Sequence, residues 1–226
     1  MEIVFILVEP IVPENIGVSA RALKTMGFEK LWLVNPCDHL SEGALTLAHG
    51  SHEILNQAVV FNSFKDVRDR CDFLIGTTAK PRKVHADWHR AEDIPELILS
   101  KSGTVNCTGI VFGREDQGLS NEELKMCDLV SGIRSAVRFP SLNLGQTVML
   151  YAYLLSGIRN NTKSQPVHAE AGFRNLKNIA EELLHFVDMT EDTPIYSRIF
   201  ERLALLNDKD SRLLFSVLNA WKERKR

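Results

Sequence analysis

Three stretches of the 226-residue chain concentrate residue types that bind phosphate, ribose or a small polar ligand. The first, residues 9–21, follows a predicted strand and places Asn15 near a helix start and Arg21 within that helix. An amide and a guanidinium so placed could meet a phosphate or a ribose at the strand end. Taken alone, the stretch favours plainer roles, with Asn15 as a helix N-cap and Arg21 as a solvated charge. It lacks the Gly-x-Gly-x-x-Gly pattern of a Rossmann-type cofactor site.

The second stretch, residues 109–124, runs from the end of a predicted strand into a predicted helix. It combines two glycines, two opposite charges and a Ser-x-x-Glu capping box, namely Gly113, Gly118, Arg114, Glu115, Ser120 and Glu123. The capping box predicts the helix start. The glycines would let the backbone approach another group closely. A simple turn needs one glycine but not this density of ionisable groups.

The third stretch, residues 139–148, leads into a long apolar helix. Ser141 and Asn143 lie near its first turn, where free backbone N–H groups would suit an anionic or polar ligand group. Helix capping by either residue explains the same pattern equally well.

The elements that must position these stretches follow from apolar runs and helical spacing. Strands are predicted at residues 3–8, 30–34, 58–61, 73–76, 108–112 and 129–133. Helices are predicted at residues 14–26, 121–126 and 144–158, the first ending at Gly27 as a C-cap. This alternation is typical of a mostly parallel α/β sheet, whose binding sites lie at the strand ends.

A composition change near residue 160 divides the chain. We predict a first domain over residues 1–160, a linker over 161–169 and a helical extension over 170–226. The extension carries three amphipathic stripes. Three short helices make too little core to stand alone, so we expect them to pack on the first domain or on a partner subunit.

Charge and cysteine usage limit the class of protein. Lys and Arg number 27 against 29 Asp and Glu, so no global field draws the molecule to nucleic acid, and any RNA-binding residues must cluster. The four cysteines form no Cys-x-x-Cys pair, which argues against a disulfide framework and a thiolate zinc site; we predict no metal. The apolar run at the amino terminus is too short for a signal peptide or a membrane span, which favours a cytoplasmic protein.

The three stretches together resemble a known family. Asn15-x-Gly17-x-x-x-Arg21, then the stretch from Phe112-Gly113-Arg114-Glu115 to Glu123, then Ser141-Leu142-Asn143-Leu144 are similar in order and spacing to the three motifs of the SpoU (TrmH-like) family of SPOUT methyltransferases. The resemblance covers residues 1 to about 160. The segment Gly76-Thr77-Thr78-Ala79 and the helical extension resemble the TrmJ branch in particular.

This resemblance implies an α/β fold with a deep trefoil knot, S-adenosylmethionine as cofactor, a homodimer and methylation of an RNA ribose 2′-hydroxyl. The RNA is expected to be tRNA, with rRNA open. The implied cofactor pocket comprises Thr78, Ala79, Lys80, Gly113, Ile133, Pro140, Ser141 and Leu142.

The resemblance also implies catalytic roles. Arg21 would act with support from Asn15, Glu115 and Asn143 would organise the pocket, and Ser141 would lie near the target nucleotide. Because an arginine stays protonated in proteins, we expect Arg21 to orient the adjacent phosphate and stabilise the developing alkoxide rather than act as a base.

Basic residues in two loops beside the implied pocket would bind RNA phosphates. They are Lys80, Arg82, Lys83, Arg134 and Arg138, with Arg90 nearby. Lys80 occupies a position at which the branch tends to have arginine. Lysine keeps the positive charge but lacks the planar guanidinium group, so RNA affinity or substrate choice should differ. Two alternatives stay open: a SPOUT enzyme that methylates a base, and a cofactor-binding or RNA-binding protein without catalysis.

Overall fold

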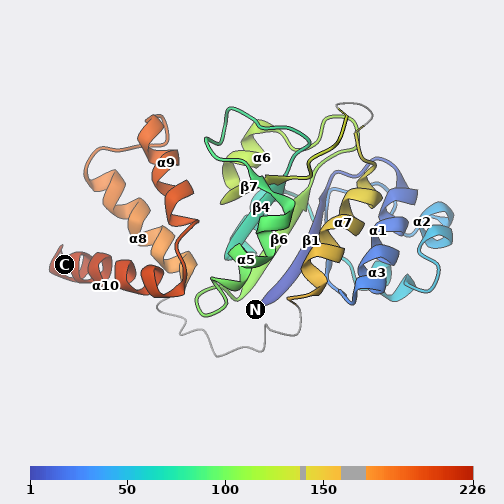
Figure 1. Ribbon diagram of the computed structural model, residues 1–226, viewed down its shortest axis with the longest axis horizontal. Coiled ribbons are helices and arrows are strands. Elements are labelled where there is room, and N and C mark those ends of the chain that lie inside the picture. Colours follow the sequence, from blue (N-terminus) through green and yellow to red (C-terminus); the bar gives the residue numbers. More distant parts are fainter. Residues whose placement is uncertain (138–140, 159–171, 226) are drawn as a thin grey trace.

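The fold is a parallel α/β sheet with a helical extension (Figure 1). The computed structural model describes residues 1–137, 141–158 and 172–225. The strands are β1 (Glu2–Val8), β2 (Leu31–Val34), β3 (Val59–Phe61), β4 (Phe73–Thr77), β5 (His89–Arg90), β6 (Cys107–Phe112) and β7 (Leu129–Gly132). Neighbouring strands all pair in parallel, in the order β3-β2-β1-β6-β4-β7-β5. The predicted parallel sheet is confirmed; only the two-residue β5 was too short to leave an apolar run.

Helices connect the strands. They are α1 (Pro13–Met26), α2 (Glu42–Leu47), α3 (His52–Asn56), α4 (Phe64–Arg70), the 3₁₀ turn η1 (Ala91–Asp93), α5 (Ile94–Leu99), α6 (Asn121–Met126) and α7 (Leu144–Ser156). The predicted C-cap of α1 is confirmed, with Gly27 at φ 79°. The capping box of α6 is confirmed as well.

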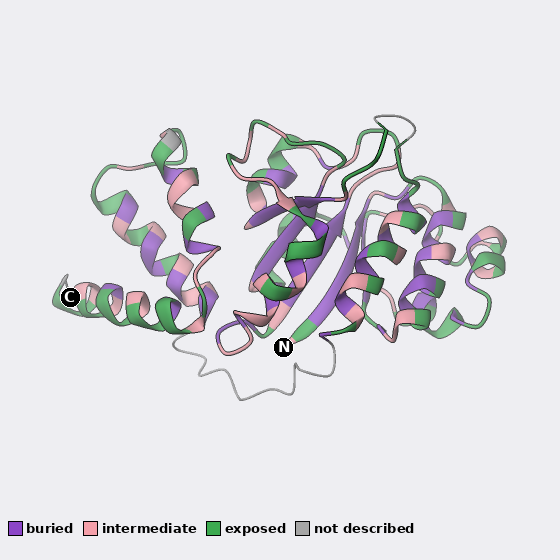
Figure 2. Ribbon diagram, in the orientation of Figure 1, coloured by how far each residue is buried: buried purple, intermediate pink, exposed green. Residues whose placement is uncertain are grey.

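Alternating side chains of the strands face two separate cores. On β1, Phe5 and Leu7 pack in the larger core, which α1, α2, α3, α5 and α7 cover. Val4 and Ile6 point to the other face, which α4 and α6 cover. The central strands are therefore buried on both sides, as Figure 2 shows.

The chain crosses back over the sheet after β7. β7 lies next to the edge strand β5, whereas the following helix, α7, packs against α1 beside the central strands. Tyr151 of α7 holds this crossing, because its ring meets Phe112 edge-on at 5.5 Å and its hydroxyl donates to Ser131 Oγ at 2.9 Å. The crossing brings the third sequence stretch beside the first. The trefoil knot stays a prediction; residues 138–140 of the returning segment lie outside the described residues.

The extension consists of α8 (Phe173–Phe186), α9 (Pro194–Leu203) and α10 (Asp208–Lys225), and it packs on the first domain. The Phe173 ring meets Phe73 of β4 edge-on at 5.7 Å. The Nζ of Lys101 lies 5.2 Å from the Phe73 ring centroid and 4.7 Å from that of Phe173. Packing on the first domain was one of the two arrangements expected. The predicted linker, residues 161–169, lies outside the described residues.

Hydrogen bonds reinforce this contact. Asp208, at the start of α10, accepts from Gly103 N and Thr104 Oγ1, each at 2.7 Å. Among the described residues, no helix is long and apolar enough to cross a membrane. All four cysteines are free thiols.

Candidate active site at the strand ends

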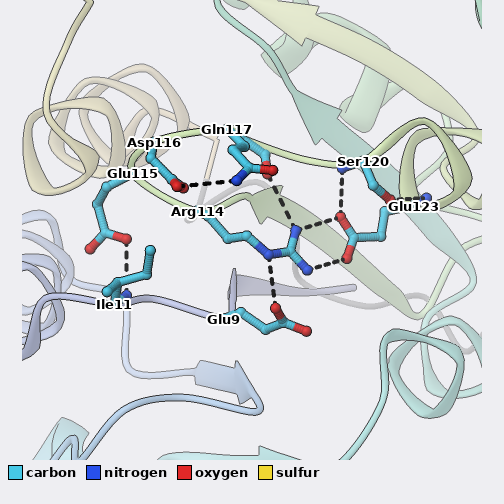
Figure 3. A network of polar contacts seen from close by, with 9 residues as sticks. Glu9, Ile11, Arg114, Glu115, Asp116, Gln117, Ser120 and Glu123 are labelled. Atoms are coloured by element: carbon cyan, nitrogen blue, oxygen red, sulfur yellow. Dashed lines mark hydrogen bonds and ion pairs between the residues drawn. The ribbon is translucent and has the colours of Figure 1, made fainter.

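The three sequence stretches meet at the carboxyl ends of β1 and β6, around the carboxylate of Glu115. Its oxygens accept hydrogen bonds from Ile11 N at 3.0 Å, Val12 N at 3.2 Å and Asn15 Nδ2 at 2.9 Å. Figure 3 shows the Glu115 side chain directed toward Ile11, which follows β1. The carboxylate thus fixes the start of α1 against the loop that follows β6.

Asn15 is not the helix N-cap that the first stretch alone favoured. α1 begins at Pro13 with Val12 as its N-cap, because proline is suited to the first helical position. Asn15 therefore lies inside the first turn and is buried, 8% exposed. Its Nδ2 donates to Glu115, and its Oδ1 accepts from Asn143 Nδ2 at 2.8 Å.

Asn143 both caps a helix and joins the site. Its Oδ1 accepts from Gly145 N at 2.8 Å, which caps α7, while its Nδ2 donates to Asn15. The capping role proposed for this residue is confirmed, and it does not exclude a second one. Glu115, Asn15 and Asn143 form one continuous chain of hydrogen bonds, in which each amide has a single satisfactory orientation.

The Glu115 carboxylate is electrostatically stabilised in its charged form. Partial burial raises its pKa, but the hydrogen bonds from Asn15, Ile11 and Val12 outweigh that effect and leave the pKa below its ordinary value. A charged acceptor at this position makes each of these hydrogen bonds stronger than a neutral one.

Arg114 stabilises the loop between β6 and α6. Its Nε donates to Glu9 at 2.8 Å, and its Nη1 and Nη2 donate to the two oxygens of Glu123, each at 3.0 Å (Figure 3). Hydrogen bonds from Arg114 to Glu123 and Glu9 raise its pKa above the usual arginine value. The opposite charges of Arg114 and Glu115 therefore have different partners and do not pair with each other.

The loop between β6 and α6 has no space for a side chain at Gly113. A Cβ at this position would lie 2.1 Å from the carbonyl carbon of Gly118, whose own φ is +70°. The close backbone approach expected from the two glycines is thus made within residues 113–119.

Arg21 projects from α1 without a partner. It is exposed, and its guanidinium makes no hydrogen bond or ion pair with any residue that the structure describes. Ser141 and Leu142 are also exposed, at the end of the returning segment that leads into α7. Pro140 and Arg138, two further predicted site residues, lie outside the described residues.

The other predicted cofactor residues lie at the ends of β4 and β7. Thr78 N donates to Ser131 O at 2.9 Å, which places Thr78, Ala79 and Lys80 beside the segment that continues to Ile133. A Cβ on Gly132 would fall 2.3 Å from Thr78 O and 2.5 Å from the ring of Trp88. Trp88, which the sequence analysis did not single out, packs against this position. An aromatic residue just before an edge strand was the available signal.

The basic residues of the two loops are available for a ligand. Lys80, Lys83 and Arg134 are exposed and Arg82 is partly so, and none forms an ion pair within the described part of the chain. Arg90 pairs with Glu92 on the surface at 3.3 Å.

A parallel α/β sheet with clustered polar groups beyond the carboxyl ends of its strands defines an α/β protein with a ligand site at that edge. Residues 2–153 match the SpoU rRNA Methylase family, and residues 170–224 match the C-terminal domain of the tRNA/rRNA methyltransferase LasT. The chain therefore belongs to the SpoU rRNA methylase family.

Individual relatives place the chain within that family. It is 36% identical over 220 residues to the uncharacterized tRNA/rRNA methyltransferase LasT of Escherichia coli, with 97% of this chain and 96% of that one covered. It is 30% identical over 225 residues to the tRNA (cytidine-2′-O-)-methyltransferase TrmJ of Methanocaldococcus jannaschii, covering 94% and 96%. The crystal structure of TrmJ from Z. mobilis is 28% identical, with a TM-score of 0.70 over 98% of this chain and 100% of that one. The predicted TrmJ-like branch is confirmed.

Proposed function

We propose that the protein transfers a methyl group from S-adenosylmethionine to a ribose 2′-hydroxyl of tRNA. The observation that carries this proposal is the hydrogen-bonded chain from Glu115 through Asn15 to Asn143, which joins all three family motifs at the strand ends. The helix that holds Asn15 also presents Arg21, whose exposed guanidinium has no partner among the described residues. The methyltransferase of M. jannaschii described above is named for this reaction on tRNA cytidine.

The residues at the ends of β4 and β7 fit the cofactor. The absence of a side chain at Gly132 lets β7 pack closely against Thr78 O and the Trp88 ring, and Leu142, 39% exposed, offers an apolar surface to a nucleoside base. We assign the cofactor to Thr78, Ala79, Lys80, Gly113, Ile133, Pro140, Ser141 and Leu142. Bound there, S-adenosylmethionine supplies the methyl group on its sulfonium.

The chain's own residues then orient the ribose. Arg21, permanently charged, holds the phosphate next to the target nucleotide and stabilises negative charge developing on the 2′-oxygen. Asn15 and Glu115 fix the first turn of the helix that carries Arg21, and Asn143 fixes the segment that ends in Ser141. Ser141 lies on the nucleotide side of the pocket. This positioning supplies the in-line geometry that methyl transfer requires.

RNA binding is assigned to the basic loops. Lys80, Arg82, Lys83, Arg134 and Arg138 would contact phosphates, which reconciles a nearly neutral chain with a polyanionic substrate. Such an enzyme would work where tRNA is processed, in the cytoplasm.

A homodimer is part of the proposal. The outer face of α7 exposes Leu150 at 38% and Tyr153 at 64%, and the neighbouring turn before α1 exposes Ile11 at 54%. Apolar side chains exposed together in this way are typical of a subunit contact. Because this face adjoins α1, a second copy would lie close to Arg21.

Replacement of Arg21 by alanine tests the assignment. We expect methyl transfer to tRNA to fall at least a hundredfold, because a developing charge loses its stabiliser. The dissociation constant for S-adenosylmethionine, measured by calorimetry, should stay within twofold. Lys24→Ala, an exposed change on the same helix, is the matched control and should keep its activity. Retained activity of Arg21→Ala, or a large loss of cofactor affinity, would contradict the role.

A further inference from the structure

The helical extension reaches the loop that follows β4 through one buried carboxylate. Glu201 of α9 is 5% exposed, and its Oε1 accepts a hydrogen bond from Ala86 N at 3.0 Å. Its Oε2 accepts from Arg198 Nη1 at 2.7 Å. A buried carboxylate is costly unless its hydrogen-bonding capacity is used, and here both oxygens are engaged.

A second contact of α9 holds the next residue of the same loop. Arg198 Nη1 donates to Asp87 Oδ2 at 2.8 Å, and Arg202 Nη1 lies 3.6 Å from the same oxygen. The hydrogen bond from Arg198 lowers the pKa of Asp87, so the pair is charged across the neutral range. Arg198 therefore bridges Glu201 and Asp87. Through these contacts the extension binds two consecutive loop residues, Ala86 and Asp87.

The ring of His85 ties this contact to the opposite face of the sheet. Its Nε2 lies 2.8 Å from Leu124 O of α6, and its Nδ1 lies 3.4 Å from Glu201 Oε1. His85, Ala86 and Asp87 are thus held between α6 of the first domain and α9 of the extension.

The segment held in this way leads directly into Trp88. The Trp88 ring stands so close to Gly132 that a Cβ there would approach it to 2.5 Å, beside Thr78 O. Its indole Nε1 is buried and has no hydrogen-bond partner among the described residues. On the other side, the loop carries the exposed Lys80 and Lys83. A displacement of residues 85–87 would therefore move both a wall of the assigned cofactor pocket and the assigned RNA-binding lysines.

We propose that Glu201 is a positioning residue, through which the helical extension holds residues 82–88 in the conformation that binds tRNA. The proposal rests on the proposed function for the identity of the ligand. The structural part of the proposal does not depend on the ligand. Because α9 supplies a charged acceptor, the backbone amide of Ala86 is protected from hydrogen exchange and Trp88 is held against Gly132. The extension thus takes part in the site through the loop that follows β4.

Glu201→Gln tests this, because it keeps the shape of the side chain and removes its charge. The matched control is Glu182→Gln on α8, which removes the carboxylate that Lys222 contacts at 2.7 Å within the same extension. In the cofactor-free protein, we expect hydrogen exchange across residues 82–88 to rise at least tenfold in Glu201→Gln and to stay unchanged in Glu182→Gln. Measured well below the Tm of both variants, the KM for tRNA should rise about tenfold with kcat within threefold.

Asp87→Asn provides a second variant that leaves the extension untouched. It should change exchange and KM in the same direction but less, since the Asp87 and Arg198 side chains are 33% and 35% exposed. Unchanged exchange in both variants, or faster exchange with an unchanged KM, would overturn the positioning role. If the wild-type protein transfers no methyl group, the proposed function fails, and the exchange measurement alone then decides whether Glu201 holds the loop.

Discussion

The hydrogen-bonded chain at the strand ends predicts a specific cost for Glu115→Gln. The carboxylate accepts three hydrogen bonds, from two backbone amides and from Asn15. A glutamine can keep its oxygen on Val12 N and Asn15 Nδ2, but its NH₂ group then faces Ile11 N, so that two donors meet. One charge-assisted hydrogen bond is lost and one amide is left without an acceptor.

The magnitude follows from that geometry. A hydrogen bond to a charged group contributes about 1.5–3 kcal/mol. Because Glu115 is only partly buried, we take the lower end, about 1.5 kcal/mol. For a chain of this length, that corresponds to a fall in Tm of roughly 3–6 °C. Methyl transfer, measured well below both unfolding temperatures, should fall about tenfold or more, because Asn15 and Asn143 lose their fixed orientation.

Thermal unfolding at several pH values is the assay, with Asp116→Asn as control. Asp116 is exposed, and its carboxylate accepts from the neighbouring Gln117, so its replacement should change stability by less than about 0.5 kcal/mol. The lowered pKa of Glu115 makes its stabilisation complete above the ordinary carboxyl pKa of about 4.3, and the stabilisation is lost as pH falls through the lower, folded-state value. The Tm difference between wild type and Glu115→Gln should therefore shrink below about pH 4. Equal Tm values for Glu115→Gln and Asp116→Asn at pH 7 would refute the reasoning.

Two further predictions concern the extension and the RNA. Burial lowers the pKa of Lys101 to about 8, so the unfolded chain binds more protons than the folded one from about pH 8 to 10. Stability should rise over that window by up to roughly 3 kcal/mol, and urea unfolding of Lys101→Met should not show this rise. Replacing Lys80 or Lys83 by glutamine should each reduce the slope of log affinity for tRNA against log salt by about 0.7–0.9, and unchanged slopes would remove these lysines from the phosphate contact.

Local patterns sufficed for the six longer strands, for helices α1, α6 and α7 and for the order of the motifs, but not for the shorter helices α2 to α5. Gly27 marks the end of α1 in the sequence, and the capping box of Ser120 and Glu123 marks the start of α6, whereas the pattern that favours Asn15 as N-cap misplaces the start of α1, which lies at Pro13. The contacts between stretches did not follow from such patterns. Glu115 and Asn15 are 100 positions apart, and only the crossing of the chain after β7 brings Asn143 to them.

The sequence also did not predict which partners the charged residues have. Arg114 and Glu115 are adjacent in sequence but have different partners. Arg114 donates to Glu9 and to Glu123 of α6, whereas Glu115 accepts from Asn15 of α1. In the sequence, nothing distinguishes Glu201 from a solvent-exposed charged residue of a helix. Its burial depends on how α9 packs on the loop after β4. Residues of this kind become visible only once tertiary contacts are known.

The central claim is a methyl transfer to ribose, and the position of the label tests it most directly. tRNA lacking the modification would be incubated with the protein and S-adenosylmethionine labelled in its methyl group, then hydrolysed with alkali. A 2′-O-methyl group blocks cleavage of the adjacent phosphodiester, so we predict the label in alkali-resistant dinucleotides. Label recovered in the bases would identify a base methyltransferase, and absence of label would indicate a binding protein; either result would contradict the account.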